Sequence, residues 1–251
     1  MLTLHTQSGK AVAEADDLPP GSVWIDLYNP SRDEELRLEG LLGVMIPTQE
    51  DMAEIETSSR LYVENNAAYM TAQVAFSAVS HCCNPAPVTF CLVKKRLVTV
   101  RYIEPASFAI FCGHIEKQPV LAGDGVTAFL NLLDVIIDRT ADLIEKTEQN
   151  VDAVSKAIFR VKRETKLEEA LIDIGNAQNN IAKIRDSLVS LARLTAFAHS
   201  LDDAVIGLKD GALQDARARL RTMSQDVASL SDHAQLHHRQ HVVSARPRRS
   251  A

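Results

Sequence analysis

The chain has 251 residues, of which 46% are hydrophobic and 5% are aromatic, and its formal net charge at pH 7 is −6. This length allows one large domain or two small ones, and the modest negative charge excludes a generally basic nucleic-acid-binding protein. The four cysteines show no Cys-x-x-Cys spacing, which favours reduced, partly buried thiols. The chain shows no signal peptide and no window of ~18 apolar residues, so we expect a soluble, cytosolic chain without a membrane span.

The first half, up to about residue 120, has the pattern of a mixed α+β domain. Alternating apolar and polar residues predict a strand at 23–27. A helix should follow, because Ser31 and Glu34 have the spacing of a capping box and Gly43 suits a helix end.

A second helix and four strands should complete this domain. Thr48 can cap an acidic helix. The strands are expected in two pairs, joined by turns at 65–66 and 94–96. These four runs are 60–63, 68–76, 88–93 and 97–102. The basic turn at 94–96 is interpreted as a solvated turn. A short helix at 107–117 and a hinge rich in Gly and Pro lead into the second half.

The second half is expected to be helical. No Gly or Pro interrupts residues 126–164, and apolar or small residues recur there in steps of four and three. They are Leu133, Ile137, Thr140, Ile144, Thr147, Val151, Val154, Ile158 and Val161. Further helices are expected at about 166–199 and from near Ala212. The first of these has apolar residues on one face: Leu167, Leu171, Ile174, Ile181, Ile184, Leu188, Leu191 and Leu194. The fold class is therefore α+β: an N-terminal α/β domain followed by an elongated antiparallel helical bundle of two long helices and a stalk helix.

These patterns divide the chain into three parts. Residues 1–122 form the predicted α/β domain, 123–235 the long-helix and stalk region, and 236–251 an atypical tail rich in His and Arg. His233 and His237 have a helical i, i+4 spacing that can hold Zn²⁺, and adventitious surface binding is the favoured interpretation there.

Acidic residues recur at helical spacing on the first long helix. They are Asp134, Asp138, Asp142, Glu145 and Glu148. A solvated face is one interpretation. The other is that rows of carboxylates from neighbouring subunits share Mg²⁺, which prefers oxygen ligands. The chain contains no phosphate-binding loop, nucleophile elbow or zinc-protease motif, so we do not expect an enzyme.

Several segments resemble the CorA family of divalent-cation transporters. They are Val-Trp-Ile-Asp-Leu-Tyr-Asn-Pro at 23–30, Pro-Thr-Gln-Glu-Asp-Met-Ala-Glu-Ile-Glu at 47–56, Ser-Ser-Arg-Leu-Tyr at 58–62 and Ser-Leu-Ser-Asp-His at 229–233. Their order, together with two long helices and then a stalk helix, is similar to the family's over about residues 1–235. The family's transmembrane helices and Gly-Met-Asn signature do not occur in this sequence.

The resemblance implies the cytoplasmic, cation-sensing and assembly portion of a CorA-like transporter, truncated before the pore. It implies a homopentamer at the cytoplasmic face of the inner membrane, with regulatory Mg²⁺ between domains and with Mg²⁺, Co²⁺ or Ni²⁺ as transported ions. A related branch of the family moves Zn²⁺. The alternatives are that zinc branch and, from a different class, a soluble helical scaffold or adaptor.

The sensing residues follow only loosely from the resemblance. The family places a key stalk carboxylate near an Asp-His pair, which here is Asp232-His233. The matching position falls near Ser229, which is not acidic, so Asp226 or Asp232 is the expected substitute. Acidic partners from the neighbouring α/β domain are expected by charge alone: Glu50, Asp51 and Glu54.

Overall fold

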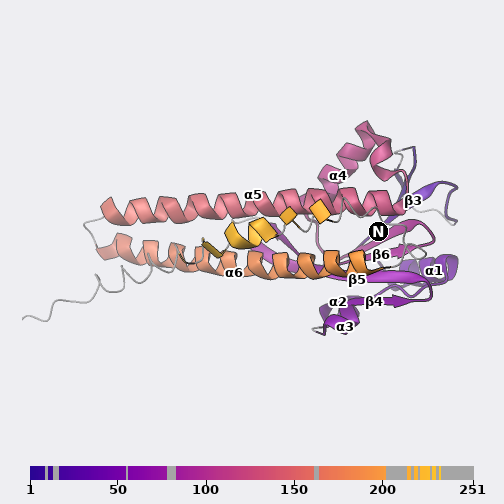
Figure 1. Ribbon diagram of the computed structural model, residues 1–251, viewed down its shortest axis with the longest axis horizontal. Coiled ribbons are helices and arrows are strands. Elements are labelled where there is room, and N and C mark those ends of the chain that lie inside the picture. Colours follow the sequence, from indigo (N-terminus) through magenta and orange to yellow (C-terminus); the bar gives the residue numbers. More distant parts are fainter. Residues whose placement is uncertain are drawn as a thin grey trace, which may run out of the picture.

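The computed structural model describes residues 1–8, 11–13, 17–54, 56–77, 83–160 and 164–201. It also describes residues 214, 215, 218, 219, 221–226, 228, 229 and 232. Within this part of the chain, seven strands form one mixed sheet, and two long helices run from the sheet far past its edge (Figure 1). The predicted mixed α+β class is confirmed. The predicted tail at 236–251 lies outside the described residues.

Strand pairing makes β3 and β7 the centre of the sheet. The strands are β1 (Leu2–Thr6), β2 (Ala11–Ala13), β3 (Ser22–Tyr28), β4 (Leu61–Glu64), β5 (Ala67–Ser77), β6 (Cys83–Val93) and β7 (Arg96–Arg101). Their order is β2-β1-β3-β7-β6-β5-β4, and only the β3–β7 pair among these is parallel. The five predicted strands are confirmed as β3 to β7, whereas β1 and β2 were not predicted.

Local turn chemistry explains the two predicted hairpins. Asn65 and Asn66 have φ values of +50° and +58°, and Lys94 and Lys95 have φ values of +49° and +64°. Consecutive left-handed residues twist a two-residue turn in the direction that paired strands require. The tip at 94–96 is a turn, as predicted, but Lys94 also donates to the Leu42 carbonyl at 2.6 Å.

Strand β6 begins five residues earlier than the predicted run, and this additional stretch contains two prolines. Pro85 and Pro87 pair with Ala75 and Gln73 of β5. Proline is tolerated at a sheet edge, where one side of the strand has no ladder. The pairing of β6 with β7 starts at Val88, so the preceding residues have a neighbouring strand on one side only.

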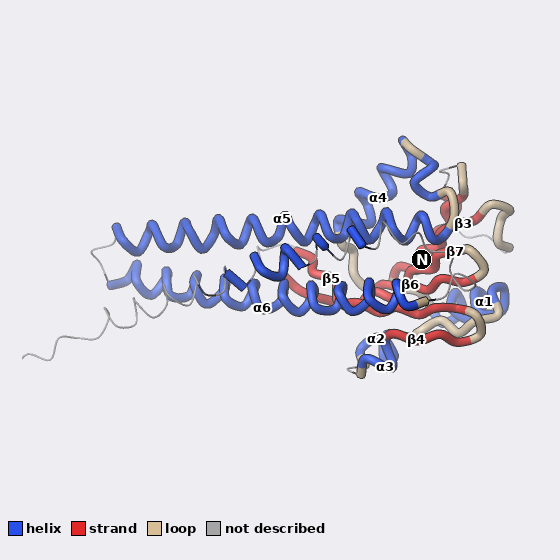
Figure 2. The backbone as a smooth tube through the Cα atoms, viewed as in Figure 1, coloured by secondary structure: helices blue, strands red, loops and turns tan. Residues whose placement is uncertain are grey.

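Helices cover the two faces of the sheet unequally (Figure 2). The helices are α1 (Arg32–Leu42), α2 (Gln49–Ala53), α3 (Thr57–Arg60), α4 (Ala106–Lys117), the 3₁₀ turn η1 (Pro119–Ala122), α5 (Gly125–Arg160) and α6 (Glu164–Ser200). The larger core joins one face to α4, α5 and α6. The smaller core joins the other face to α1 and α2.

The short helices on the smaller-core face are defined by caps. Ser31 accepts from the Glu34 N–H, and the Glu34 side chain accepts from the Ser31 N–H at 2.8 Å. Gly43 ends α1 in the left-handed conformation, with φ +72°. Thr48 caps α2 in the same reciprocal manner with Asp51. All three predicted helix boundaries are confirmed.

The long helices match their predicted stripes where side chains are described. With 36 and 37 residues, α5 and α6 are each about 55 Å long. The first six stripe positions of α5, from Leu133 to Val151, are all buried. Val154, Ile158 and Val161, together with Leu167 and Leu171 of α6, lie outside the residues whose side chains are described. Six predicted α6 positions are also buried. They are Ile174, Ile181, Ile184, Leu188, Leu191 and Leu194.

The start of α5 needs glycine because it passes close to the β6–β7 turn. The Gly125 N–H donates to the Lys95 carbonyl at 2.9 Å. A β-carbon at position 125 would lie 2.3 Å from the Arg96 carbonyl carbon. The start of α5 therefore lies directly against the sheet, at the end of the segment where a Gly- and Pro-rich hinge was predicted.

Helix α6 is joined to β5 by side-chain hydroxyls. Ser187 accepts from the Ala75 N–H at 3.0 Å and donates to the Gln73 carbonyl at 2.7 Å, and Ser190 accepts from the Gln73 N–H at 2.9 Å. Pairing between β4 and β5 ends at Met70, so these serines satisfy backbone groups on the stretch of β5 beyond β4.

The described residues between 214 and 232 are helical, as expected for the third helix. Met223 in this segment belongs to the larger core, so the segment packs on the same side of the sheet as α5. No helix in the described part of the chain is long and apolar enough to span a membrane.

Candidate functional site

The predicted acidic residues of α2 are partly used by the fold itself. The Asp51 carboxylate accepts from the Thr48 N–H at 2.8 Å and from the Thr48 hydroxyl at 2.7 Å. It therefore acts as the reciprocal cap of α2. Glu50 and Glu54 are exposed, and the Glu54 carbonyl accepts from Arg60. Of these three carboxylates, those of Glu50 and Glu54 carry no capping bond, while Asp51 is committed to the helix end.

The predicted carboxylates of the third helix lie on the opposite side of the molecule. Asp226 and Asp232 are exposed, in a segment that packs with α5, whereas α2 belongs to the other core. One copy of the chain therefore does not bring the two predicted groups of acids together. The assignment of all five residues as metal ligands stays a prediction.

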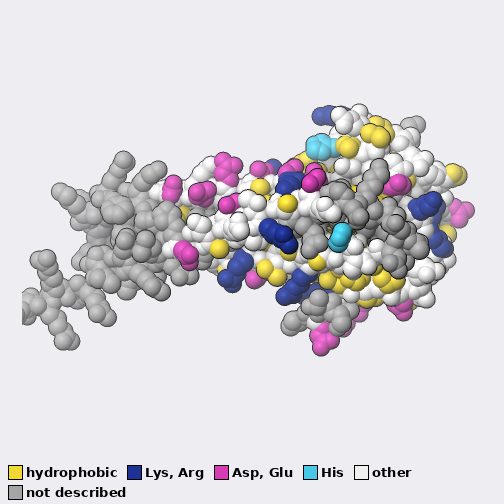
Figure 3. All heavy atoms as spheres, viewed as in Figure 1, with side chains coloured by type: hydrophobic (Ala, Val, Ile, Leu, Met, Phe, Trp, Pro, Cys, Tyr) yellow, Lys and Arg dark blue, Asp and Glu magenta, His cyan; other side chains and the backbone are white. Residues whose placement is uncertain are grey.

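The acidic row of α5 is exposed along the projecting part of the molecule (Figure 3). Arg219 of the third segment forms ion pairs with both Asp134 and Asp138, four residues apart on α5. Asp142 pairs with Arg139 on its own helix. Part of the row is thus neutralised within the chain, and the guanidinium of Arg219 lies where a cation bridging two carboxylates would lie.

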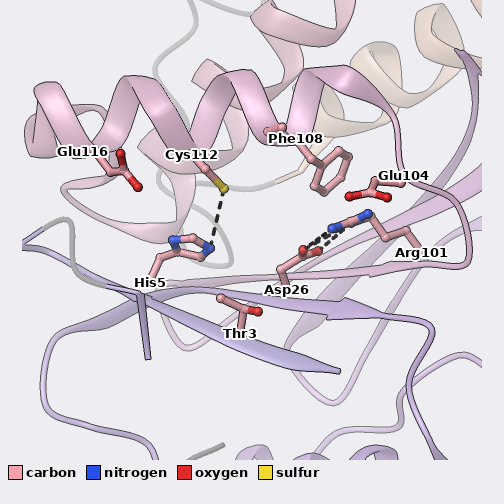
Figure 4. Close-up of a pocket in the computed structure, with 9 residues that line it drawn as sticks. Thr3, His5, Asp26, Arg101, Glu104, Phe108, Cys112 and Glu116 are labelled. Carbon is pink, nitrogen blue, oxygen red and sulfur yellow. Dashed lines mark hydrogen bonds and ion pairs between the residues drawn. The ribbon is translucent and has the colours of Figure 1, made fainter. Parts of the chain in front are cut away.

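A cavity of about 270 Å³ opens between α4 and the strands β1, β3 and β7 (Figure 4). Its lining combines acidic, basic, thiol and imidazole groups. The lining residues are Thr3, His5, Asp26, Arg101, Glu104, Phe108, Ala109, Cys112 and Glu116. This polar cavity is a candidate binding site.

A buried ion pair forms one end of this cavity. Arg101 donates from Nη2 to the Asp26 carboxylate at 2.8 Å and from Nε to both of its oxygens at 3.2 Å. Thr99 donates to the same carboxylate at 2.7 Å and accepts from the Trp24 indole at 2.9 Å. The guanidinium also lies over the Phe108 ring. Because the Asp26 carboxylate is bonded to both Arg101 and Thr99, we interpret this buried pair as a structural link between β3 and β7.

His5 and Cys112 form the other end. The imidazole stacks on Trp24 with ring centroids 4.2 Å apart, and its Nε2 lies 3.9 Å from the Cys112 sulfur. Burial lowers the pKa of His5, although the nearby acids Asp26 and Glu116 oppose this effect. Burial likewise raises the pKa of the Cys112 thiol to about 11. Both groups are therefore uncharged near neutral pH.

The sequence analysis did not identify these cavity residues as candidate site residues. Asp26 lies within an otherwise apolar run and Arg101 follows another, and a charged residue in a central strand is a signal of a buried pair. His5 could not be recognised because β1 was not predicted. The pairing of β3 with β7 joins residues about 75 positions apart, which no local pattern indicates.

The described residues hold no ready-made metal centre. No group of three or more His, Cys, Asp and Glu side chains among them is arranged to enclose an ion. The carboxylates present are hard oxygen donors, which fit Mg²⁺ by chemistry. Within one copy, the described residues do not gather these carboxylates into a single site.

The architecture defines a class of protein domain that solved structures share. The soluble domain of CorA from Methanocaldococcus jannaschii superposes with a TM-score of 0.69, at 10% identity, covering 97% of this chain and 94% of that one. The ZntB cytoplasmic domain from Vibrio parahaemolyticus gives a TM-score of 0.70 at 9% identity and covers 97% of both chains. At these identities the likeness shows the fold.

Sequence comparison identifies the family. The family described as "CorA-like Mg2+ transporter protein" matches residues 20–242. The magnesium transport proteins CorA of Escherichia coli K12 and Salmonella typhimurium are each 26% identical over 212 residues, which is 84% of this chain and 65% of theirs. The chain therefore belongs to the CorA-like family, and its match spans slightly less than two thirds of those relatives. The resemblance inferred from the sequence is confirmed.

Proposed function

We propose that the chain is the cytoplasmic, cation-sensing and assembly portion of a CorA-like divalent-cation transport protein. The family match over residues 20–242 carries this proposal. The fold supports it, because the soluble domain of CorA from Methanocaldococcus jannaschii superposes on 97% of this chain. The function is that of a regulatory part of a transporter at the cytoplasmic face of a membrane, not that of an enzyme.

Mg²⁺ is the proposed regulatory ion, bound between copies of the chain. Asp226 and Asp232 are exposed on the third helix, and Glu50 and Glu54 are exposed beside α2 on the other side of the molecule. Opposite sides of one chain meet in a ring of identical copies, since a head-to-tail interface joins two different surfaces. An ion between them would neutralise carboxylates that otherwise repel, so assembly would depend on the Mg²⁺ concentration.

The zinc branch is the second candidate. The ZntB cytoplasmic domain superposes on this chain as well as the CorA domain does, so the fold favours neither branch. The magnesium transport proteins among the relatives favour Mg²⁺. The predicted division of the chain at residues 122 and 123 stays a prediction under either function.

The proposal is tested by the thermal unfolding midpoint of the full chain in Mg²⁺ and in chelator. A ligand at 100 times its Kd adds about 2.7 kcal/mol to the free energy of unfolding, so the midpoint should rise clearly. The double variant Asp226→Asn, Asp232→Asn should lose this rise. The variant Asp33→Asn, which changes an exposed acid of α1, should keep it.

Two outcomes would redirect the function. If Mg²⁺ leaves the midpoint unchanged while the chain forms a stable assembly, the scaffold alternative is favoured. If Zn²⁺ stabilises at lower concentrations than Mg²⁺ and this effect disappears in the double variant, the zinc branch is favoured. Using the double variant excludes zinc bound by histidines elsewhere in the chain.

A further inference from the structure

The cavity beneath α4 carries an excess of negative charge. Its lining contains three carboxylates and one guanidinium. The Asp26 carboxylate is matched by Arg101, whereas Glu104 and Glu116 form no ion pair or hydrogen bond with another described residue. Both glutamates are exposed, so a dissolved ligand can reach them. The cavity therefore attracts a cation more strongly than an anion.

A buried imidazole with a weak hydrogen-bond partner faces the same cavity. His5 is 5% exposed, and the Cys112 sulfur at 3.9 Å is the hydrogen-bond partner of its ring within the described part of the chain. Buried polar groups usually have stronger partners than a thiol at this distance. Burial favours the neutral ring, in which one nitrogen can accept a hydrogen bond. The ring thus offers an acceptor to a ligand that brings an N–H group.

The wall contributed by α4 has an acid near each end and less polar groups between them. Glu104 lies two residues before α4, and Glu116 lies in its last turn. Phe108 and Cys112 occupy the positions between them in steps of four, so the four side chains follow one face of the helix (Figure 4). This arrangement suits a linear aliphatic chain that carries a cationic group at each end.

The size and the donors of the cavity also favour an organic cation. At about 30 Å³ for each water, a cavity of 270 Å³ has room for roughly nine waters, which is the size of a small organic molecule. No three of the described His, Cys, Asp and Glu side chains are placed to hold a metal ion. An ammonium group has no such requirement, because it donates separate hydrogen bonds to separate acceptors.

We propose that this cavity binds an aliphatic polyamine. One ammonium group donates to the Glu116 carboxylate and to the His5 ring, and another donates to Glu104. The methylene groups between them lie against Phe108 and Cys112. The ligand links α4 to β1. This site is separate from the exposed carboxylates proposed to bind Mg²⁺, so the two proposals are tested independently.

The test is calorimetric titration of the full chain with spermidine, a linear triamine, and with butylamine, a monoamine of similar chemistry. The titrations are made in about 0.15 M salt with millimolar Mg²⁺, which screens and competes for amines at exposed carboxylates. Spermidine should bind with a stoichiometry of one. Butylamine, which can reach only one of the two acids, should bind at least about threefold more weakly.

Two kinds of variant locate the binding. Glu104→Gln and Glu116→Gln should each weaken spermidine binding by about threefold to tenfold, whereas Asp33→Asn, at an exposed acid on the other side of the sheet, should not. Ala109→Phe should abolish binding because its ring fills the cavity, and Ala106→Phe, at an exposed position of α4 outside the lining, should retain it.

The exposed positions of these residues allow the variants to fold, so each result bears on the site itself. The proposal is overturned if spermidine binds no more tightly than butylamine, or if Ala109→Phe binds spermidine as the parent chain does. It is also overturned if Asp33→Asn weakens binding as much as the two glutamine variants, because the amine would then be held by surface charge alone.

Discussion

The two faces of the sheet differ in how far their helices depend on local polar contacts. On the face covered by α4, α5 and α6, the Asp26–Arg101 pair joins residues 75 positions apart. On the same face, Ser187 and Ala75 are bonded across 112 positions. On the face covered by α1 and α2, the capping bonds join residues three positions apart. The polar contacts of the helix-rich face thus join residues far apart in the sequence. On the other face, local caps define α1 and α2, and distant contacts such as Lys94 with the Leu42 carbonyl and Tyr102 with Glu35 then join α1 to the sheet.

This difference predicts where the chain tolerates change. A buried polar group that loses a distant partner keeps its desolvation cost, whereas a helix end that loses its cap can bond to water. Substitutions on the helix-rich face should therefore cost more than equivalent substitutions in the caps. Four substitutions, ordered by expected effect, test this comparison.

Asp26→Ala should have the largest effect. It leaves the buried guanidinium of Arg101 without its counter-charge, and breaking a buried pair from one side typically costs about 3–5 kcal/mol of unfolding free energy. Urea unfolding measures this loss. Asp33→Ala, at an exposed acid in the first turn of α1, is the control and should change stability by less than about 0.5 kcal/mol. Similar small losses in both variants would contradict a structural role for the pair.

Ser187→Ala should have the second-largest effect. It leaves the Ala75 N–H and the Gln73 carbonyl without their bonds to α6, which should cost about 1–3 kcal/mol. Ser200→Ala serves as the control, because that exposed hydroxyl bonds only to the Phe197 carbonyl of its own helix within the described residues. The comparison fails if the two serine variants unfold at the same urea concentration.

Ser31→Ala tests the local contacts on the other face. Losing the N-cap of α1 should cost about 1 kcal/mol, less than the loss in Ser187→Ala. Ser31→Asp, which retains an oxygen acceptor, should recover most of that stability. If the alanine variant is destabilised more than Ser187→Ala in the same urea series, the proposed ranking of the two faces is wrong.

Arg219→Gln should have the smallest effect. Its ion pairs with Asp134 and Asp138 are partly exposed, and pairs of this kind contribute less than about 1 kcal/mol. The difference from the parent chain should shrink in 1 M salt, which screens exposed charges. Arg221→Gln, at an exposed neighbour, should show no such salt dependence. A large loss that is insensitive to salt would show that Arg219 acts in another way.

The same contrast explains what the sequence could predict. The helix caps act within a few residues, so spacing alone predicted the roles of Ser31, Glu34, Gly43 and Thr48. The long helices were readable because one apolar stripe repeats along each of them. In each of these cases the signal and the structure lie in the same short stretch of chain.

The missed elements depend on distant partners. Strand β1 is short, and its role follows from its pairing with β3. The early start of β6 was hidden by Pro85, which is tolerated because β7 does not extend that far. The cavity arises where β1, β3, β7 and α4 meet. Its residues come from three separate parts of the sequence, so no local motif could indicate it.

The predicted metal ligands show the same difference between local and distant signals. Charge and resemblance selected Asp51, but its carboxylate caps α2. Asp226 and Asp232 are exposed, as ligands between copies would have to be before assembly. Contacts between carboxylates of two copies depend on how the copies assemble. No short sequence pattern indicates such an assembly.

Sedimentation velocity of the full chain in millimolar Mg²⁺ and in chelator tests whether Mg²⁺ joins copies of this chain through exposed carboxylates. If it does, larger species should form in Mg²⁺, revert in chelator and be absent in the double variant Asp226→Asn, Asp232→Asn. The same distribution of species with and without Mg²⁺, in both the parent chain and the double variant, would contradict it.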